Sequence, residues 1–350
     1  MLSSTAAWFD SPFMKACRSE QTPYTPIWLM RQAGRFMSEF RAIRSRVGFL
    51  ELCKNPELAA QVTVMAVDML EVDAAIIFAD ILLPLEPMGV GLEYVRGEGP
   101  VIHRPVRGLA DCRQLAEVVV EESLDYVLTA IKLTRQALKP AIPLIGFAAA
   151  PFTLASYLIE GGASRNFEAT KTLMRTEPET WELLMSKIAS VTLHYLNCQV
   201  AAGAQVVQLF DSWVGCLSPV DYRQFVQPYT KRVIDGIAPG TPVIHFGTGT
   251  GSLLTLMQAA GGDVIGLDWR VNLGDAWAQL ASPVAVQGNL DPTVLLSGRQ
   301  EIKRQASLIL EAASRRPGHI FNLGHGVLPT TEVDNVRYLV DYVHSFRRNQ

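Results

Sequence analysis

The sequence predicts an α/β fold, a (β/α)8 TIM barrel built as a single domain, and three observations support this prediction. Short apolar runs recur down the whole chain, and amphipathic segments separate most of them. Most of the strong polar residues near these runs follow their ends. No stretch rich in proline, glycine and serine divides the 350 residues. We therefore expect one barrel domain over residues 1–350, in which residues 1–22 form a poorly ordered N-terminal arm.

The first half of the chain supplies four of the eight expected strands. They are PIWLM (26–30), AAIIFA (74–79), PLIGFA (143–148) and QVVQLF (205–210). A helix is expected between the first two strands, in NPELAAQVTVMAVDML, because Asn55 can cap it and Pro56 suits its first position. A hairpin is expected at 90–106, where two alternating runs flank RGEG.

The second half of the chain supplies the other four strands. They are PVIHFG (242–247), DVIGLDW (263–269), VAVQGN (284–289) and HIFNLG (319–324). The segment SPVDYRQFVQPYTKRVIDGI has a helix start like the one above, with Ser218 before Pro219. Eight strands followed by helices in one chain of this length indicate a closed barrel.

The composition excludes several classes of protein. A net charge of −3 gives no overall attraction to nucleic acid or to an anionic membrane, so any anion-binding site has to be local. The N-terminus lacks a basic region followed by an apolar run, and no apolar stretch reaches about eighteen residues, so we expect a cytoplasmic protein with no membrane segment. The cysteines are widely spaced and never form C-x-x-C pairs, which indicates reduced thiols and neither a disulfide framework nor a zinc knuckle. They are Cys17, Cys53, Cys112, Cys198 and Cys216.

Polar residues gather at one rim of the expected barrel. Active sites of such barrels lie at the carboxyl ends of the strands. Each of these residues has a simpler interpretation as a cap of the following helix, but their common placement favours a site. The strand-end positions are Arg31, Asp80, Pro151 and the segment beyond it, Asp211 with Ser212, the GTGTG loop after His245, Asp268, Asn289 with Asp291, and His325.

An arginine cluster follows the first expected strand. On a helical first turn, Arg31 and Arg35 would project from one face, because they are four residues apart. Guanidinium groups bind carboxylates in pairs, which suits a ligand that carries several carboxylates. The alternative is a solvated helix face with Glu39 and Glu51 as partners. The position after a strand favours the ligand. The whole cluster, in LMRQAGRFMSEFRAIR (29–44), is Arg31, Arg35, Arg41 and Arg44.

Asp80 stands in AAIIFADILLPL with apolar neighbours on both sides. An unpartnered buried charge is unfavourable, so Asp80 should meet hydrogen-bond donors or have a raised pKa. Capping a helix at ILLP is the alternative, which Pro84 weakens. The strand-end position favours a functional role.

The segment HFGTGTGS, with Asp268 further on, imitates a dinucleotide-binding fingerprint. The third glycine comes one residue early, and the fingerprint normally opens the first βα unit, so a loop near a ligand or a plain tight turn is favoured over NAD. His325, between two glycines in NLGHGVLPTT, could donate a hydrogen bond or transfer a proton. His245 could do the same or point into the core, and Tyr157 could supply a hydroxyl or be a core aromatic.

The chain resembles the uroporphyrinogen decarboxylase family over essentially its whole length. Seven motifs occur in the family's order, a highly specific combination: MRQAGR, FADIL, GFAAAPFTLASYLIEGG, FDSW, GLDWR, QGNLDP and FNLGHGVLPTT. The resemblance implies a (β/α)8 barrel, usually a homodimer, that acts in porphyrin, heme and chlorophyll biosynthesis. It also implies the reaction: the four acetate side chains of uroporphyrinogen III become methyl groups, giving coproporphyrinogen III and carbon dioxide with no cofactor or metal. Departures from the family pattern are Phe36 for tyrosine, Ser38 for proline and Ala149 for glycine.

The resemblance also implies residue roles. Asp80 would accept hydrogen bonds from the pyrrole N–H groups and stabilise a cationic intermediate, and Arg31 and Arg35 would act in catalysis as well as in binding. The implied contacts to the tetrapyrrole are Arg31, Arg35, Arg44, Asp80, Tyr157, Ser212 and His325.

Two rival functions remain open at this point. Related enzymes move methyl groups between corrinoid proteins and thiols, and they bind zinc through an H-x-C motif. Here the corresponding stretch reads His245-Phe246-Gly247, without the cysteine, which argues against such a site. The other rival is a tetrapyrrole-binding protein without activity, against which Asp80 and the paired arginines argue.

Overall fold

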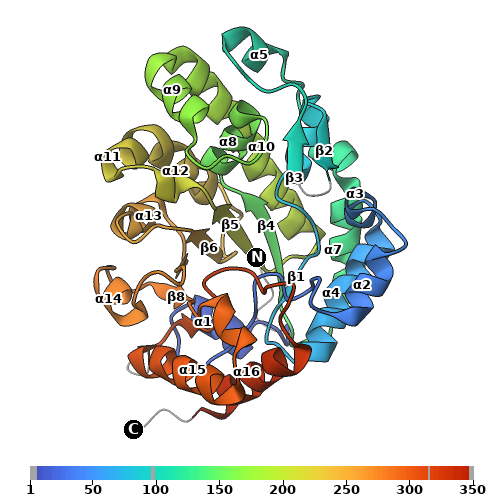
Figure 1. Ribbon diagram of the computed structural model, residues 1–350, viewed down its shortest axis with the longest axis vertical. Helices are drawn as coiled ribbons and strands as arrows, with labels where there is room; N and C mark the ends of the chain where they lie inside the picture. The colour runs from blue at the N-terminus through green and yellow to red at the C-terminus, as the bar shows by residue number, and fades with distance from the viewer. Residues whose placement is uncertain (1–5, 96–98, 314–315, 347–350) are drawn as a thin grey trace.

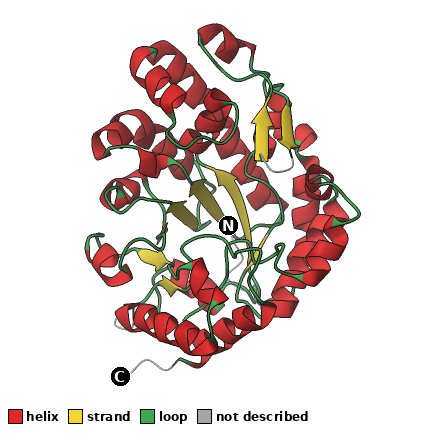
Figure 2. Cartoon of the chain, in the orientation of Figure 1, coloured by secondary structure: helices red, strands yellow, loops and turns green. Residues whose placement is uncertain are grey.

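A curved, parallel, seven-stranded sheet lies at the centre of the computed structural model, which describes residues 6–95, 99–313 and 316–346. The strands are drawn in yellow in Figure 2, with helices packed around them. Seven of the eight predicted strands are therefore confirmed. In their order across the sheet they are β1 (Ala75–Ile76), β4 (Leu144–Ala149), β5 (Val206–Asp211), β6 (Val243–Gly247), β7 (Val264–Gly266), β8 (Ala285–Gln287) and β9 (His319–Ile320).

The expected first strand at 26–30 is reduced to a single bridge between Ile27 and Phe321. The chain still spans the gap between the two edge strands: Phe321 N donates to the Pro26 carbonyl at 2.8 Å, and Asp73 N donates to the Ile27 carbonyl at 2.8 Å. Strand pairing ends early because side-chain oxygens, and not a neighbouring strand, accept hydrogen bonds from the next backbone N–H groups. The Leu29 N–H donates to the Gln32 amide oxygen, and the Met30 N–H donates to the Asn322 amide oxygen.

Helices surround the sheet, as the sequence predicts (Figure 1). Within the described ranges, none of them combines the length and the hydrophobicity that crossing a membrane requires. In the first half of the chain they are α1 (Pro12–Cys17), α2 (Ser38–Arg44), α3 (Phe49–Cys53), α4 (Pro56–Leu70), α5 (Leu109–Gln114), α6 (Val120–Ser123), α7 (Asp125–Ala137) and α8 (Pro151–Glu160). In the second half they are α9 (Glu168–Thr176), α10 (Pro178–Ala202), α11 (Pro219–Asp221), α12 (Gln227–Asp235), α13 (Leu254–Ala260), α14 (Leu273–Ala278), α15 (Arg299–Ala313) and α16 (Val333–Ser345).

Both predicted helix caps are confirmed. The Asn55 side chain accepts the Leu58 N–H at the start of α4, and the Ser218 side chain accepts the Asp221 N–H at the start of α11. The second helix is less regular than expected, because a π-helical turn, Tyr222–Val226, separates α11 from α12. Pro228, the second residue of α12, has no N–H to continue the α-helical pattern.

The N-terminal segment departs from the expectation for residues 1–22. Residues 1–5 lie outside the described part of the chain, but residues 12–17 form α1 and are not a poorly ordered arm. Phe13 and Met14 are fully buried in a cluster with strand residues such as Ile145 and Val206. Removing these apolar side chains from water stabilises the segment against the sheet.

The predicted hairpin at 90–106 is confirmed in its two strands, β2 (Leu92–Val95) and β3 (Gly99–Ile102), which pair antiparallel. Residues 96–98, at its turn, lie outside the described residues. The hairpin lies beside α3 (Figure 1), where the rings of Phe49 and Tyr94 pack edge to face with their centres 4.9 Å apart.

Candidate active site

Arg31 has an unusual backbone conformation. Its φ of +62° lies in the left-handed region, which costs a residue other than glycine about 1–2 kcal/mol. The residues on both sides are fixed: Met30 by the Asn322 hydrogen bond, and Gln32 by its own side-chain amide, which donates to the Ala74 carbonyl at 3.1 Å. The surrounding structure therefore holds Arg31 in a strained conformation, as is common at functional sites.

The expected helical turn at 31–35 does not form, because the chain makes a series of turns there and α2 begins only at Ser38. The guanidinium groups of Arg31 and Arg35 are exposed, and no hydrogen bond or ion pair to them is found among the described residues. The alternative partners are engaged elsewhere: Glu39 accepts the Ser38 hydroxyl, and Glu51 accepts the Gly48 N–H. Two free cations therefore remain for a ligand.

Asp80 meets two donors, which is one of the outcomes expected for a buried carboxylate. Its Oδ1 accepts the Leu82 N–H at 2.8 Å and the Tyr94 hydroxyl. The capping alternative is thus partly right, since Leu82 leads into the 3-10 helix Leu83–Met88. Burial raises the pKa of Asp80, and the Tyr94 hydrogen bond acts against that rise. The positive charge of Arg31 also lowers this pKa, so the guanidinium is near the carboxylate.

Arg44 is connected to Asp80 through two aromatic rings. Its guanidinium carbon lies 5.7 Å from the centre of the Phe49 ring, and its Nη1 donates to the Val47 carbonyl. Phe49 packs on Tyr94, whose hydroxyl donates to Asp80. Arg44 therefore lies on the side of the site that carries Tyr94, although the Val47 carbonyl already accepts one of its hydrogen bonds.

Tyr157 is both a core aromatic and a neighbour of Asp80. It belongs to α8, is 9% exposed, and meets the Trp213 ring at 5.9 Å. Burial, followed by the negative charge of Asp80, raises the pKa of Tyr157 to about 12, so its hydroxyl is protonated at neutral pH. Ser212, just before Trp213, is half-buried, and its carbonyl accepts the Thr248 hydroxyl.

His325 lies at the exposed end of the last strand region. Partial burial of its ring and the charges of Arg31 and Arg270 lower its pKa below the usual value of 6.5. The negative charge of Asp268 raises the pKa of His325, but by less than the other effects lower it. The imidazole is therefore neutral near pH 7 and can donate one hydrogen bond and accept another.

A side chain of the protein itself, Asp268, binds the loop that imitates a dinucleotide fingerprint. Asp268 Oδ2 accepts the Gly249 N–H at 2.5 Å and the Arg270 guanidinium at 2.7 Å. In a dinucleotide site the acid would bind a ribose. Here it fixes a tight turn, in which Gly249 has a φ of +68°.

Asp211 and His245 form a fully buried pair. Their closest oxygen and nitrogen atoms are 3.7 Å apart, and Thr153 donates to Asp211 at 3.4 Å. Burial raises the pKa of Asp211. Of the two places considered for His245, the rim is wrong, because its side chain has no exposed surface.

The sequence reasoning missed Tyr94 and Arg270. Tyr94 was inside the predicted hairpin, but its partner Asp80 is fourteen residues away along the chain and reachable only once the hairpin folds back. Arg270 stood in the motif GLDWR, where its spacing of two from Asp268 was a usable signal for an ion pair.

Comparison with known proteins identifies the family. A family model described as uroporphyrinogen decarboxylase (URO-D) matches residues 9–346. The chain is 56% identical over 336 residues to the uroporphyrinogen decarboxylase of Carboxydothermus hydrogenoformans, with 96% of each chain covered. It is 55% identical over 337 residues to that of Sorangium cellulosum, again with 96% of each covered. A methyltransferase from Methanosarcina mazei shares the fold, with a TM-score of 0.81 at 20% identity over 95% of this chain and 98% of that one. The chain belongs to the uroporphyrinogen decarboxylase family.

Proposed function

We propose that this enzyme is a carboxy-lyase that converts the four acetate side chains of uroporphyrinogen III to methyl groups, giving coproporphyrinogen III and carbon dioxide. The observation that carries the proposal is the carboxylate of Asp80 with the guanidinium of Arg31 near it, a guanidinium that, like that of Arg35, has no partner among the described residues. The names of the curated relatives support the same reaction.

The arginines account for the binding of a highly anionic substrate. A tetrapyrrole with eight carboxylates needs a local basic patch on a chain whose net charge is −3. Arg31, Arg35 and Arg44 supply that patch, because guanidinium groups bind carboxylates through paired hydrogen bonds. Further contacts in this proposal come from Tyr157, Ser212 and His325.

Asp80 accounts for the chemistry. Protonation of a pyrrole ring at its α-carbon makes the ring a cation that can accept an electron pair. The bond between the acetate methylene and its carboxylate then breaks, carbon dioxide leaves, and the bonding electrons move into the ring. A proton adds to the exocyclic carbon to give the methyl group, and the ring loses its extra proton. The carboxylate of Asp80, near the pyrrole nitrogens, stabilises the cation electrostatically.

These steps are proton transfers and the cleavage of one carbon–carbon bond, whose electron pair stays on the substrate, so the substrate is its own electron sink and the proposed reaction needs no cofactor or metal. The arginine nearest the reacting acetate orients it and assists the proton transfer. We assign this role to Arg31 or Arg35. Both guanidinium groups are free of partners within the described chain, so both can bind the carboxylate that leaves.

The direct test is anaerobic incubation of the purified protein with uroporphyrinogen III and a metal chelator. After oxidation, chromatography separates porphyrins by their number of carboxylates. We expect a ladder from eight carboxylates to four. A substrate that binds but keeps eight carboxylates would instead support a binding protein, and the proposal would be wrong.

Replacing Asp80 by asparagine separates binding from catalysis. Asp80→Asn keeps the shape of the side chain but removes the charge, so we expect binding to remain measurable while turnover falls about 100- to 1000-fold. Asp235→Asn, which alters an exposed carboxylate paired with Lys231 on α12, is the control and should leave turnover unchanged. Unchanged turnover in Asp80→Asn would remove the role assigned to that carboxylate.

For the architecture, we propose that the segment 26–28 closes the curved sheet into a (β/α)8 barrel and that the chain is a single domain. Backbone hydrogen bonds from this segment to Phe321 and to Asp73, at the two edges of the sheet, support the closure. The resemblance also leads us to propose a cytoplasmic homodimer. Sedimentation of the purified protein at micromolar concentration tests the dimer, and a monomer would contradict it.

A further inference from the structure

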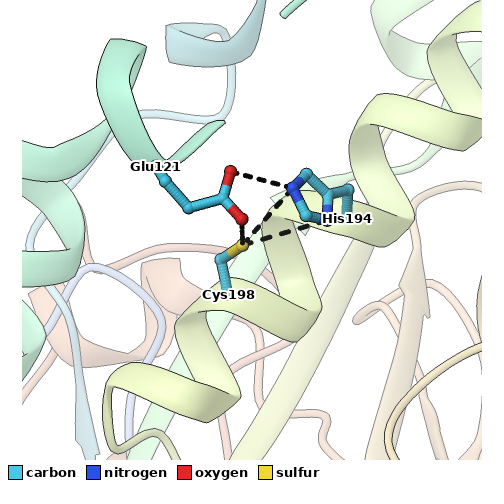
Figure 3. A group of neighbouring side chains, drawn as sticks. All are labelled: Glu121, His194 and Cys198. Atoms are coloured by element: carbon cyan, nitrogen blue, oxygen red, sulfur yellow. Dashed lines mark hydrogen bonds and ion pairs between the residues drawn. The ribbon is translucent and has the colours of Figure 1, made fainter. Parts of the chain in front are cut away.

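A group of three possible metal ligands lies outside the candidate active site. It consists of Glu121, His194 and Cys198, whose ligand atoms all lie within 4.8 Å of one another (Figure 3). In the described ranges of the chain, this is the only group of three or more histidine, cysteine and acidic residues whose ligand atoms lie that close together. None of them belongs to the elements that carry Arg31, Asp80 or Tyr157.

Two helices present the group. His194 and Cys198 are four residues apart on α10, so their side chains lie on one face of that helix. Glu121 comes from α6 and reaches across to that face (Figure 3). Glu121 and His194 are exposed and Cys198 is partly exposed, so an ion from solvent can reach all three.

The separations of the ligand atoms fit the edges of a tetrahedron around a metal ion. With typical zinc bonds of about 2.3 Å to sulfur and about 2.0 Å to nitrogen or oxygen, those edges are about 3.3–3.6 Å. Cys198 Sγ lies 3.6 Å from Glu121 Oε1 and 3.8 Å from His194 Nε2. His194 Nε2 lies 3.0 Å from Glu121 Oε2. One oxygen of Glu121 would serve as the ligand, and the three ligand atoms all lie within 4.8 Å of one another, so a rotation of the exposed Glu121 carboxylate can bring that oxygen to both neighbours.

We propose that Glu121, His194 and Cys198 form a surface site for a zinc-like divalent cation, with solvent in the fourth position. The donor set supports this choice, because a thiolate and an imidazole together favour Zn²⁺ over the oxygen-binding ions Mg²⁺ and Ca²⁺. The thiol proton leaves to solvent when the ion binds, and no group is oxidised or reduced.

Such an ion would join α6 to α10 and hold the segment before α7 against the outer layer of helices. This consequence is structural and does not depend on the proposed reaction. Another exposed pair, His103 with Glu93 at 2.9 Å, has no thiol and is not part of a three-ligand group in the described chain.

Cobalt replaces zinc in sites of this kind and reports on the ligands. We expect Co²⁺ added to the purified, reduced protein to give a thiolate-to-cobalt absorption band in the near ultraviolet and the visible bands of a tetrahedral ion, at one equivalent per chain. Zn²⁺ should displace the cobalt and remove both sets of bands. It should also raise the Tm by several degrees, by an amount that grows with the logarithm of the ratio of free Zn²⁺ to the Kd.

Matched variants make the test specific. Cys198→Ser should abolish the thiolate band, and His194→Ala and Glu121→Gln should each weaken Co²⁺ binding at least tenfold. Cys216→Ser, which changes another partly exposed free cysteine, should keep the band. Decarboxylation should be the same in Cys198→Ser as in the wild type, so this test and the test of the proposed function can fail separately.

Two outcomes would overturn the proposal. Absence of the thiolate band at millimolar Co²⁺ would mean that the three side chains form only a hydrogen-bonded surface cluster. A band that persists in Cys198→Ser and disappears in Cys216→Ser would place the ion at a different thiol.

Discussion

At the scale of single residues, the most unusual feature is the left-handed backbone of Arg31, which the protein keeps although glycine would fit better. Arg31→Gly should raise the free energy of unfolding by about 1 kcal/mol, because glycine adopts this conformation without strain. The same change should raise KM for the tetrapyrrole, because it removes a guanidinium. Urea unfolding and steady-state kinetics measure the two effects.

Glu71 provides a matched control for this prediction. It ends α4 with a φ of +54°, is exposed, and lies outside the proposed site. Glu71→Gly should give a similar stabilisation with unchanged kinetics. If Arg31→Gly were as active as the wild type, the left-handed turn would be a feature of the fold and would not serve substrate binding.

The hydroxyl of Tyr94 should set the acidic limit of activity. Its hydrogen bond lowers the pKa of Asp80, so Tyr94→Phe should raise that pKa further above its usual value. Activity requires the carboxylate, so the acid limb of kcat/KM should move to higher pH by about one unit. Tyr126→Phe is the control, because the Tyr126 hydroxyl is buried with no partner among the described residues. An acid limb that stays in place would show that it reports on another group.

At the scale of elements, the loop after the last strand positions the arginine. A Cβ atom at Gly326 would lie 2.4 Å from Cδ and 2.7 Å from Cγ of Arg31, so the flexible side chain would have to move. Gly326→Ala should therefore reduce kcat/KM by up to about 100-fold with little change in Tm. Gly298→Ala, where a Cβ meets nothing within 4 Å, should affect neither. A large loss of Tm in Gly326→Ala would show that the loop backbone has no room to accommodate the change.

The elements differ in how well the sequence predicts them. Strands such as β4 and β5 are buried on both faces, so they read as continuous apolar runs and were predicted within a residue or two. The first strand was predicted too long, because Asn322, almost three hundred residues away, takes the Met30 N–H. The apolar runs also predicted that Arg31 and Asp80 lie at the ends of strands. The runs did not predict how the two side chains lie relative to each other, because this depends on the turn at Arg31 and on the packing of the hairpin that carries Tyr94.

At the scale of the whole molecule, Asp73 links the two ends of the described chain. Its carboxylate accepts the Ile27 N–H at 2.7 Å, the Tyr24 hydroxyl at 2.8 Å and the His344 ring nitrogen of α16 at 2.8 Å. Asp73→Asn should therefore lower the free energy of unfolding by about 2 kcal/mol, and it should make that free energy depend less on pH.

The pH dependence follows from His344. Burial lowers its pKa, but the hydrogen bond and charge of Asp73, with smaller effects of Asp341 and Glu71, raise it above 6.5 overall. The raised pKa means that this group contributes its full stability below about pH 6.5 and loses it as pH rises through the folded-state value. Urea unfolding at several pH values should show that the free energy of unfolding declines as pH rises above about 6.5, and this decline should be absent in Asp73→Asn. His103→Gln, at an exposed histidine, should keep the wild-type decline.

The Asp73 junction also bears on how the protein is made. Translation delivers Ile27 and Asp73 well before Phe321 and His344. Until then the nascent chain cannot complete the arrangement that covers Trp28 and the other apolar side chains inside the sheet. A ribosome stalled before α16 would therefore carry a chain with an exposed apolar interior and an open sheet edge, the two features that chaperones bind and that promote aggregation.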